Sequence, residues 1–254
     1  MPAKGVQTTP PSPSSGGVAI PASGWSGLHA ILVGDGDVPP RAALDAAWPA
    51  WDAEVALVVG ADGGATKALA VGLRPHLVVG DADSLGADGL AAIRAAGIPV
   101  ELAATAKDES DLELAVRAAV ARGATRVTIL GALGGPRFDH ALANAWLLAL
   151  PALAGRNAVL LDAATRVRLL DGSAGDGEVR LRGRPGDLVS LFPFGADAGG
   201  VITDGLAYPL RDEPLPFGPA RGLSNVRSAP EARVSLRAGR LLIVETRLME
   251  GFAG

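Results

Sequence analysis

Two apolar runs, each followed by glycine and then aspartate, stand out in the hydrophobic pattern of the chain. Residues 55–64 read VALVVGADGG and residues 77–84 read LVVGDADS. Both runs are continuously apolar rather than alternating, which is typical of parallel strands buried on both faces. Residues 65–71 between them fit a helix that ends at Gly72. The pattern therefore predicts a strand–helix–strand unit.

The same succession of strands and helices extends to both sides of this unit. Apolar runs predict strands at residues 28–33, 98–102, 126–130 and 158–161, and helical patterns occupy residues 41–48, 87–96, 111–122 and 138–150. Ser110 and Glu113 form a capping box that begins one helix at Asp111. Leu142, Trp146 and Leu150 give the last helix an apolar stripe. Residues 27–163 are thus predicted to form a Rossmann-like domain with a parallel sheet.

From about residue 164 the pattern changes to short runs, several of which alternate apolar and polar side chains. They cover residues 165–170, 177–182, 187–192, 200–203, 231–236 and 241–246. Residues 237–240, with the sequence RAGR, fit a hairpin turn. Because no helical pattern is present, we expect residues 164–254 to form an all-β domain, a β-sandwich or a flattened barrel. The predicted fold class is α/β followed by all-β.

The composition is that of a globular protein and narrows the range of partners. The chain has 254 residues, of which 48% are hydrophobic, and a net charge of −4. This charge provides no basic surface for nucleic acid or an anionic membrane. The richest apolar stretch, residues 141–155, is too short to span a bilayer. The absence of cysteine fits a reducing, cytoplasmic location and excludes thiolate chemistry. Residues 1–26 are rich in Pro, Ser and Gly and predict a disordered tail.

Three aspartates follow the two central strands. Because ligands bind beyond the carboxyl ends of parallel strands, Asp62, Asp81 and Asp83 are expected side by side at one edge of the sheet. Two unit charges about 4 Å apart repel by roughly 4 kcal/mol at an effective dielectric near 20. The acids therefore either hold a divalent cation or point outward as turn residues. For Asp62 alone both interpretations stand; for Asp81 and Asp83 together the pattern favours the metal.

Two further loops bring polar side chains toward the same edge. Asp108 and Asp111 flank a helix N-terminus, where the helix dipole alone explains carboxylates, but the helix follows a strand of the same sheet. Residues 131–140 form a glycine-rich turn before another helix, with Arg137 suited to phosphate and Asp139 beside it. His140 is interpreted as a packing residue of the helix. The glycine-rich loop 34–37 and the Gly63-Gly64 pair carry little weight alone, because the chain has 34 glycines.

Five motifs together resemble the thiamine pyrophosphokinase family. They occur in the family's order and spacing at residues 61–64 (ADGG), 80–84 (GDADS), 107–111 (KDESD), 137–140 (RFDH) and 222–225 (GLSN). The resemblance implies an α/β domain followed by a β-sandwich. It also implies transfer of a pyrophosphoryl group from ATP to the hydroxyl group of thiamine, with Mg²⁺, by a homodimer whose active sites are shared between subunits.

The resemblance also implies roles for individual residues. Asp81, Asp83 and Asp111 would hold magnesium. The ATP and acceptor pocket would be lined by Asp62, Gly63, Gly64, Asp108, Arg137 and Asp139, with Asp108 or Asp111 orienting the acceptor hydroxyl. Ser224 and Asn225 would contact thiamine.

Two departures from the family pattern leave the acceptor open. Pro136 stands where the family usually has glycine before the arginine, and residues 164–254 contain no tryptophan to stack on thiamine. Tyr208, Phe194 or Phe217 would have to supply the ring. The alternatives are a related pyrophosphokinase with another acceptor, such as a hydroxymethyl-dihydropterin, and a catalytically silent nucleotide-binding protein.

Overall fold

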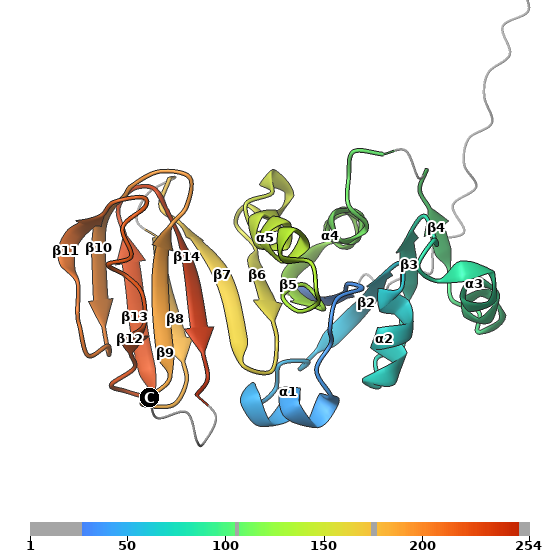
Figure 1. Ribbon diagram of the computed structural model, residues 1–254, viewed down its shortest axis with the longest axis horizontal. Coiled ribbons are helices and arrows are strands. Elements are labelled where there is room, and N and C mark those ends of the chain that lie inside the picture. Colours follow the sequence, from blue (N-terminus) through green and yellow to red (C-terminus); the bar gives the residue numbers. More distant parts are fainter. Residues whose placement is uncertain (1–26, 105–106, 174–176, 249–254) are drawn as a thin grey trace, which may run out of the picture.

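The computed structural model describes residues 27–104, 107–173 and 177–248, and one ten-stranded mixed sheet runs through most of them (Figure 1). The predicted tail, residues 1–26, lies outside the described residues. In spatial order the strands are β12 (Asn225–Val226), β9 (Leu188–Pro193), β14 (Arg240–Thr246), β7 (Thr165–Asp171), β6 (Asn157–Leu161), β5 (Ala124–Leu130), β1 (Leu28–Val33), β2 (Val55–Ala61), β3 (Leu77–Gly80) and β4 (Val100–Leu102).

The six strands from β6 to β4 are parallel to one another, as the continuous apolar runs predict. The chain begins in the middle of this group with β1. It then adds β2, β3 and β4 on one side and β5 and β6 on the other. The order of the strands therefore reverses between β1 and β5. In sheets of this kind the crevice for a ligand opens at the reversal, beyond the carboxyl ends of the strands.

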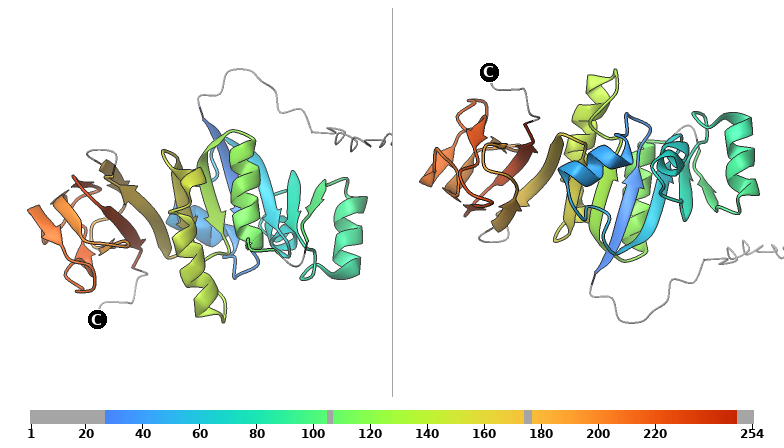
Figure 2. Two further views of the ribbon diagram at one scale, coloured as in Figure 1. Left: turned by 90° about the horizontal axis from the view of Figure 1, so that it is seen from above. Right: turned by 90° about the horizontal axis from the view of Figure 1, so that it is seen from below.

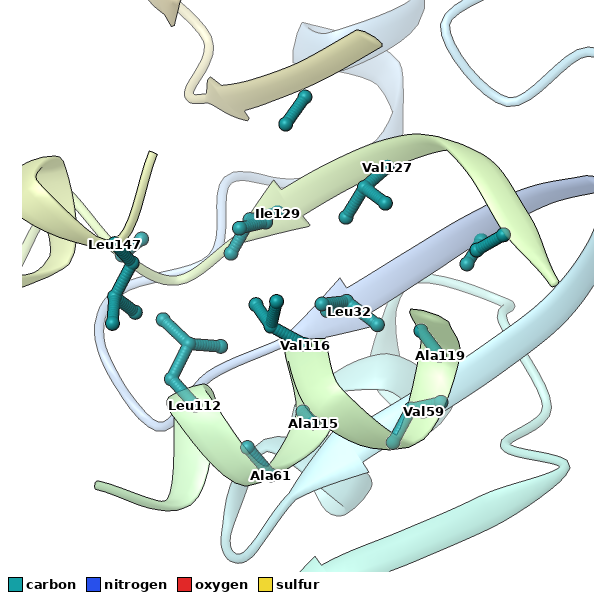
Figure 3. Close-up of a cluster of buried hydrophobic side chains, with 14 of the residues drawn as sticks. Leu32, Val59, Ala61, Leu112, Ala115, Val116, Ala119, Val127, Ile129 and Leu147 are labelled. Carbon is teal, nitrogen blue, oxygen red and sulfur yellow. The ribbon is translucent and has the colours of Figure 1, made fainter. Parts of the chain in front are cut away.

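Helices cover both faces of the parallel strands (Figure 2). On one face lie α1 (Arg41–Ala47), α2 (Gly64–Ala70) and α3 (Gly86–Ala95), and on the other lie α4 (Asp111–Ala121), α5 (Phe138–Leu147) and the short 3-10 helix η1 (Pro151–Leu153). Figure 3 shows Leu112, Val116 and Ala119 of α4 packed against β1, β2 and β5. This packing fixes the N-terminus of α4 at the carboxyl edge of the sheet.

The sheet continues into the C-terminal part because β7 pairs antiparallel with β6. A second, antiparallel sheet has the order β11 (Arg211–Leu215), β10 (Ala198–Asp204), β13 (Glu231–Leu236) and β8 (Gly177–Arg182). Leu191 and Ile243 of the first sheet share one buried cluster with Leu181 and Val234 of the second. The fold is therefore an α/β arrangement with a mixed sheet, followed by an antiparallel sheet. The predicted domain boundary at residue 163 lies between β6 and β7, inside the continuous sheet.

Three details of the predicted elements are wrong. Residues 237–240 do not close a hairpin, because β13 pairs with β8 and β10 while β14 pairs with β7 and β9 in the other sheet. The helix predicted to end at residue 150 ends at Leu147, and two residues of its apolar stripe, Leu142 and Trp146, are 41% and 56% exposed. Strands β11 and β12 were not predicted. Within the described residues, no helix combines the length and the apolar character needed to cross a membrane.

Candidate active site

A cavity of about 580 Å³ opens at the carboxyl edge of the parallel strands, where their order reverses. Loops from four strands form its wall: Gly34–Gly36 after β1, Asp62 after β2, Asp83 and Ser84 after β3, and Gly131 with residues 134–137 after β5. The first turn of α4 and the side chains of His140 and Asn144 on α5 complete it. The loops predicted to lie at the carboxyl edge of the sheet therefore surround one cavity, which we call the acidic cavity.

Three aspartates form a compact group, of which Asp62 and Asp83 line this cavity and Asp81 lies beside them outside the lining. Carboxylate oxygens of Asp62, Asp81 and Asp83 all lie within 4.8 Å of one another. Asp62 is only 2% exposed. Its Oδ2 accepts a hydrogen bond from the Ser84 backbone N–H at 3.0 Å, whereas its buried Oδ1 has no partner among the described residues. A buried carboxylate oxygen without a partner is costly, and a cation placed among the three acids would remove that cost.

The pKa directions agree with crowding of like charges. Burial raises the pKa of Asp62, and the neighbouring carboxyl group of Asp83 raises it further. The same neighbour relation lowers the pKa of Asp83. The backbone supports the arrangement at a cost, because Asp62 and Ala82 have φ of 48° and 65°, in the left-handed region that non-glycine residues rarely adopt. Such conformations cluster at functional sites.

Lys107 connects this group to the first turn of α4. Its Nζ lies 2.5 Å from Asp111 Oδ1 and 4.0 Å from Asp81 Oδ2. Burial disfavours the charge on Lys107, but the hydrogen bond to Asp111 and the nearby acids outweigh burial and raise its pKa. The predicted cap holds the helix start in place, since Ser110 Oγ accepts a hydrogen bond from Glu113 N–H at 3.1 Å. Lys107 has no individual role among the predictions from the sequence, although its i, i+4 spacing from Asp111 is a signal for an ion pair.

The glycine-rich loop after β1, which by itself is weak sequence evidence for a site, contributes to the cavity wall. Gly36 N–H donates to Gly131 O at 3.0 Å, and a Cβ on Gly36 would lie 2.4 Å from that oxygen, so no larger residue fits. Lys67 on α2 binds this loop through Gly36 O at 2.9 Å and Asp35 Oδ1 at 3.1 Å. Gly63 and Gly64 are buried and are not among the lining residues. A Cβ on Gly64 would lie 1.9 Å from Val33 O, so this glycine permits α2 to begin against β1.

The loop before α5 brings Arg137 to the cavity and leaves Asp139 outside its lining. The two side chains form an ion pair at 2.5 Å, and each is 63% exposed. The hydrogen bond from Arg137 lowers the pKa of Asp139. Asp108 is exposed and does not line the cavity. His140 is exposed at the cavity wall, so its interpretation as a packing residue is wrong.

Two of the residues predicted to contact the acceptor line a smaller cavity of about 370 Å³ in the C-terminal part. Tyr208 and Asn225 line it, whereas Ser224 does not. The Asn225 side chain holds the Tyr208 loop: its Oδ1 accepts from Tyr208 N–H at 3.0 Å, and its Nδ2 donates to Tyr208 O at 2.7 Å. The Tyr208 ring stays 70% exposed. Ser224 is tied to Ser190, whose Oγ accepts its backbone N–H at 3.0 Å.

Within one chain the two cavities are separate. They have no lining residue in common. The smaller cavity is lined by Leu191 of β9, residues 207–210 between β10 and β11, residues 221–223, and Asn225 of β12. Strands β9 to β12 lie at the end of the molecule opposite α3 and β4 (Figure 1). The structure therefore brings the predicted acidic residues together, but it does not bring Tyr208 and Asn225 to them.

Comparisons with known proteins match both parts of the chain. The family model "Thiamin pyrophosphokinase, catalytic domain" matches residues 49–160, and "Thiamin pyrophosphokinase, vitamin B1 binding domain" matches residues 178–241. Thiamine pyrophosphokinase of Bacillus subtilis is 26% identical over 193 residues, which is 76% of this chain and 88% of that protein. The first range contains the acidic group, and the second contains the smaller cavity.

Solved structures agree with these matches. The crystal structure of thiamine pyrophosphokinase from Bacillus subtilis has a TM-score of 0.74 at 25% identity, covering 87% of this chain and 100% of that one. The structure of thiamin pyrophosphokinase from Geobacillus thermodenitrificans has a TM-score of 0.73 at 26% identity, covering 88% and 99%.

Proposed function

The chain belongs to the thiamin pyrophosphokinase family, and on that basis we propose that it transfers the pyrophosphoryl group of ATP to the hydroxyl group of thiamine, giving thiamine diphosphate and AMP. The observation that supports this most strongly is the match of both family models, in order, to the two parts of the chain that hold the two cavities. A pterin acceptor does not account for the vitamin B1 binding match, and a silent protein does not account for the acidic group.

We propose that Asp62, Asp81 and Asp83 hold Mg²⁺. The fit rests on the unpartnered Oδ1 of Asp62 and on three carboxylates whose oxygens lie within 4.8 Å, because Mg²⁺ prefers hard oxygen ligands. When bound, this ion neutralises charge on the phosphate oxygens. Asp111 stays a predicted ligand, and it would have to give up its ion pair with Lys107 to reach the ion.

The chain's other contributions to the reaction are binding and orientation. The N-termini of α4 and α5 open at the acidic cavity, and helix N-termini favour phosphate. Arg137 has a planar guanidinium group that matches phosphate oxygens. To bind phosphate, it would have to give up its ion pair with Asp139. Asp108 or Asp111 would orient the acceptor hydroxyl. Holding the two reactants in line supplies most of the catalysis in phosphoryl transfer.

We propose that thiamine binds between two chains. The exposed Tyr208 ring offers a face for stacking, but its cavity is separate from the acidic cavity of the same chain. Exposed Phe138 and Trp146 on α5, a helix that lines the acidic cavity, provide apolar surface for a second copy. A homodimer would complete each site with a Rossmann-like part (27–163) of one chain and a β-sandwich part (164–254) of the other. A cytoplasmic location stays a prediction.

The test is a product assay with purified protein, ATP, Mg²⁺ and thiamine. We expect thiamine diphosphate and AMP in equal amounts. Formation of ADP, or turnover with a hydroxymethyl-dihydropterin and none with thiamine, would refute the assignment.

A further inference from the structure

A third cavity, of about 680 Å³, lies on the face of the sheet that α4 and α5 do not cover. Its floor is formed by β5, β6 and β7, and its walls by residues 48–51 after α1 and residues 182–184 at the end of β8. Figure 2 shows α1 on the side of the sheet opposite α4 and α5. We call this space the arginine cavity. None of its lining residues lines the acidic cavity.

The strands of the floor have two different faces. Side chains that point toward α4 and α5 are apolar and buried: Val127 and Ile129 on β5, Leu160 on β6 and Val167 on β7. The lining residues on these strands are Arg126 and Thr128 on β5, Asn157, Val159 and Leu161 on β6, and Arg166 and Arg168 on β7. Strands of a parallel sheet, such as β5 and β6, are normally apolar on both faces. The polar side chains that β5 and the antiparallel β7 place in this cavity therefore call for a ligand.

The cavity carries an excess of positive charge. Its lining includes six arginines and no acidic residue. Three of them pair with acids outside the lining, Arg126 with Glu54, Arg182 with Glu231 and Arg184 with Asp187, whereas the other three are Arg166, Arg168 and Arg247. The buried carboxylate of Glu245, on β14, accepts hydrogen bonds from three guanidinium groups: Arg166 at 2.9 Å, Arg227 at 3.1 Å and Arg168 at 3.5 Å. The single negative charge of Glu245 is therefore shared by three buried or half-buried guanidinium groups.

Arg247 adds a positive charge with no acidic partner in the described part of the chain. Its guanidinium lies 4.7 Å from the centre of the Trp48 ring, and that of Arg166 lies 4.6 Å from the same ring. The Nε atoms of Arg168 and Arg247 are buried without a hydrogen-bond partner among the described residues. Burial, together with the charges of Arg166 and other neighbouring arginines, lowers the pKa of both side chains. Because arginine does not deprotonate in proteins, the missing component is an anion.

We propose that the arginine cavity binds the diphosphate group of a small molecule, without a metal ion. Planar guanidinium forks match phosphate oxygens in pairs, and a diphosphate supplies the several negative charges that one carboxylate would not. The volume lies in the range of small-molecule sites. The Trp48 ring already contacts two arginines, so recognition would be directed at the charged group rather than at a stacked base.

The test uses inorganic pyrophosphate as the probe and isothermal titration calorimetry in EDTA and a phosphate-free buffer. EDTA removes the cation that would bridge pyrophosphate to the acidic cavity. We expect one saturable site per chain, with affinity that falls as NaCl rises. Arg247→Met should weaken binding at least tenfold without unfolding the protein, because Arg247 leaves no unpaired carboxylate behind. Arg184→Gln, at a more exposed lining position, should weaken it independently.

Two controls separate this site from others. Arg94→Gln, on α3 and outside the cavity lining, should leave the affinity unchanged, and so should Asp81→Asn. ADP should bind to the same site and compete with pyrophosphate, because it carries the same group. The proposal is overturned if the wild-type protein shows no saturable binding in EDTA. It is also overturned if Arg247→Met and Arg184→Gln bind as tightly as Arg94→Gln.

Discussion

At the scale of single residues, the acidic cavity holds more negative charge than its own cations neutralise. Asp62, Asp81, Asp83 and Asp111 gather around the single ammonium group of Lys107. Each pair of carboxylates about 4 Å apart repels by roughly 4 kcal/mol at an effective dielectric of 20. A fold keeps such a group when a ligand compensates for it, so stability and activity should respond in opposite directions when one acid is removed.

Asp81→Asn and Asp83→Asn test this opposition. Each should lower turnover by about two orders of magnitude or more, because a carboxylate oxygen is lost from the proposed ion site. The thermal midpoint in EDTA should be unchanged or slightly raised, since one repulsion is relieved. Added Mg²⁺ should raise the midpoint of the wild-type protein but not of the variants. Steady-state assays and thermal melts with and without Mg²⁺ measure both effects.

Asp204→Asn is the matched control, because Asp204 ends β10 and is exposed far from the acidic group. It should keep wild-type activity and the Mg²⁺ response. If Asp81→Asn and Asp83→Asn melt at lower temperature in EDTA and retain activity, these acids are turn residues of the fold and the metal assignment is wrong.

Two histidines predict how stability depends on pH. Loss of hydration lowers the pKa of the buried His29 and of the more exposed His76 below 6.5. Below about pH 6.5 the unfolded chain therefore binds more protons than the folded one, and stability falls as the pH drops. In His76→Gln the fall in thermal midpoint between about pH 7.5 and 5.5 should be shallower than in the wild-type protein.

Comparing how the thermal midpoint changes with pH in the two proteins isolates the contribution of His76. The raised pKa of Asp62 acts in the opposite direction, but it is common to both proteins. Equal slopes for the wild-type protein and His76→Gln would show that folding does not lower the pKa of His76.

At the scale of elements, the sequence predicts those helix starts and strands that depend on neighbouring residues. Ser110 and Glu113 fix the start of α4, and the continuous apolar runs predict β1, β2 and β3. The partner of each strand depends on distant residues instead. Gly239, with φ of 80°, makes the predicted turn, but that turn passes from one sheet to the other. For the same reason the arginine cavity could not be predicted from the sequence. Arg126 and Arg166 come together only because β5, β6 and β7 are neighbours in the sheet.

The close approach of α2 to β1 predicts a large effect for Gly64→Ala. A Cβ at this position would lie 1.9 Å from Val33 O, a backbone atom that cannot move alone. The substitution should lower the free energy of unfolding by about 1–3 kcal/mol or more. Gly89→Ala, inside α3 with its nearest contact at 3.5 Å, should instead raise it by about 0.5–1 kcal/mol. Chemical denaturation of both variants measures the contrast, and equal effects would contradict the packing argument.

The hydrogen bonds of Asn225 predict a role in positioning the Tyr208 loop. Asn225→Ala removes both bonds to the Tyr208 backbone and should raise the KM for thiamine about tenfold or more, with little change in the KM for ATP. Tyr208→Ala should have the same pattern, whereas Tyr208→Phe keeps the ring and should stay near the wild-type values. A change in the KM for ATP equal to that for thiamine would place this loop outside the acceptor site.

At the scale of the whole molecule, the two cavities of the proposed reaction face different parts of one continuous sheet. The pairing of β6 with β7 joins the parallel strands to β14 and β9. The acidic cavity and the smaller cavity lined by Tyr208 therefore belong to the same continuous sheet. Transfer between ATP and thiamine needs the reacting atoms in contact. Because the two cavities of one chain share no lining residue, we expect a second copy of the chain to bring them together.

Mixing two inactive proteins tests this arrangement. Asp81→Asn removes a proposed metal ligand in the N-terminal part, and the double variant Tyr208→Ala, Ser224→Ala removes the proposed acceptor contacts in the C-terminal part. In a heterodimer, one of the two shared sites would contain both wild-type parts. After subunit exchange by dilution and reconcentration, the mixture should regain up to about a quarter of the wild-type activity, because random exchange makes half of the dimers mixed. Light scattering at micromolar concentration should give the mass of two chains. A monomer, or a mixture no more active than its inactive parents, would place the whole acceptor site within one chain, and the separate cavities would then need a conformational change to meet.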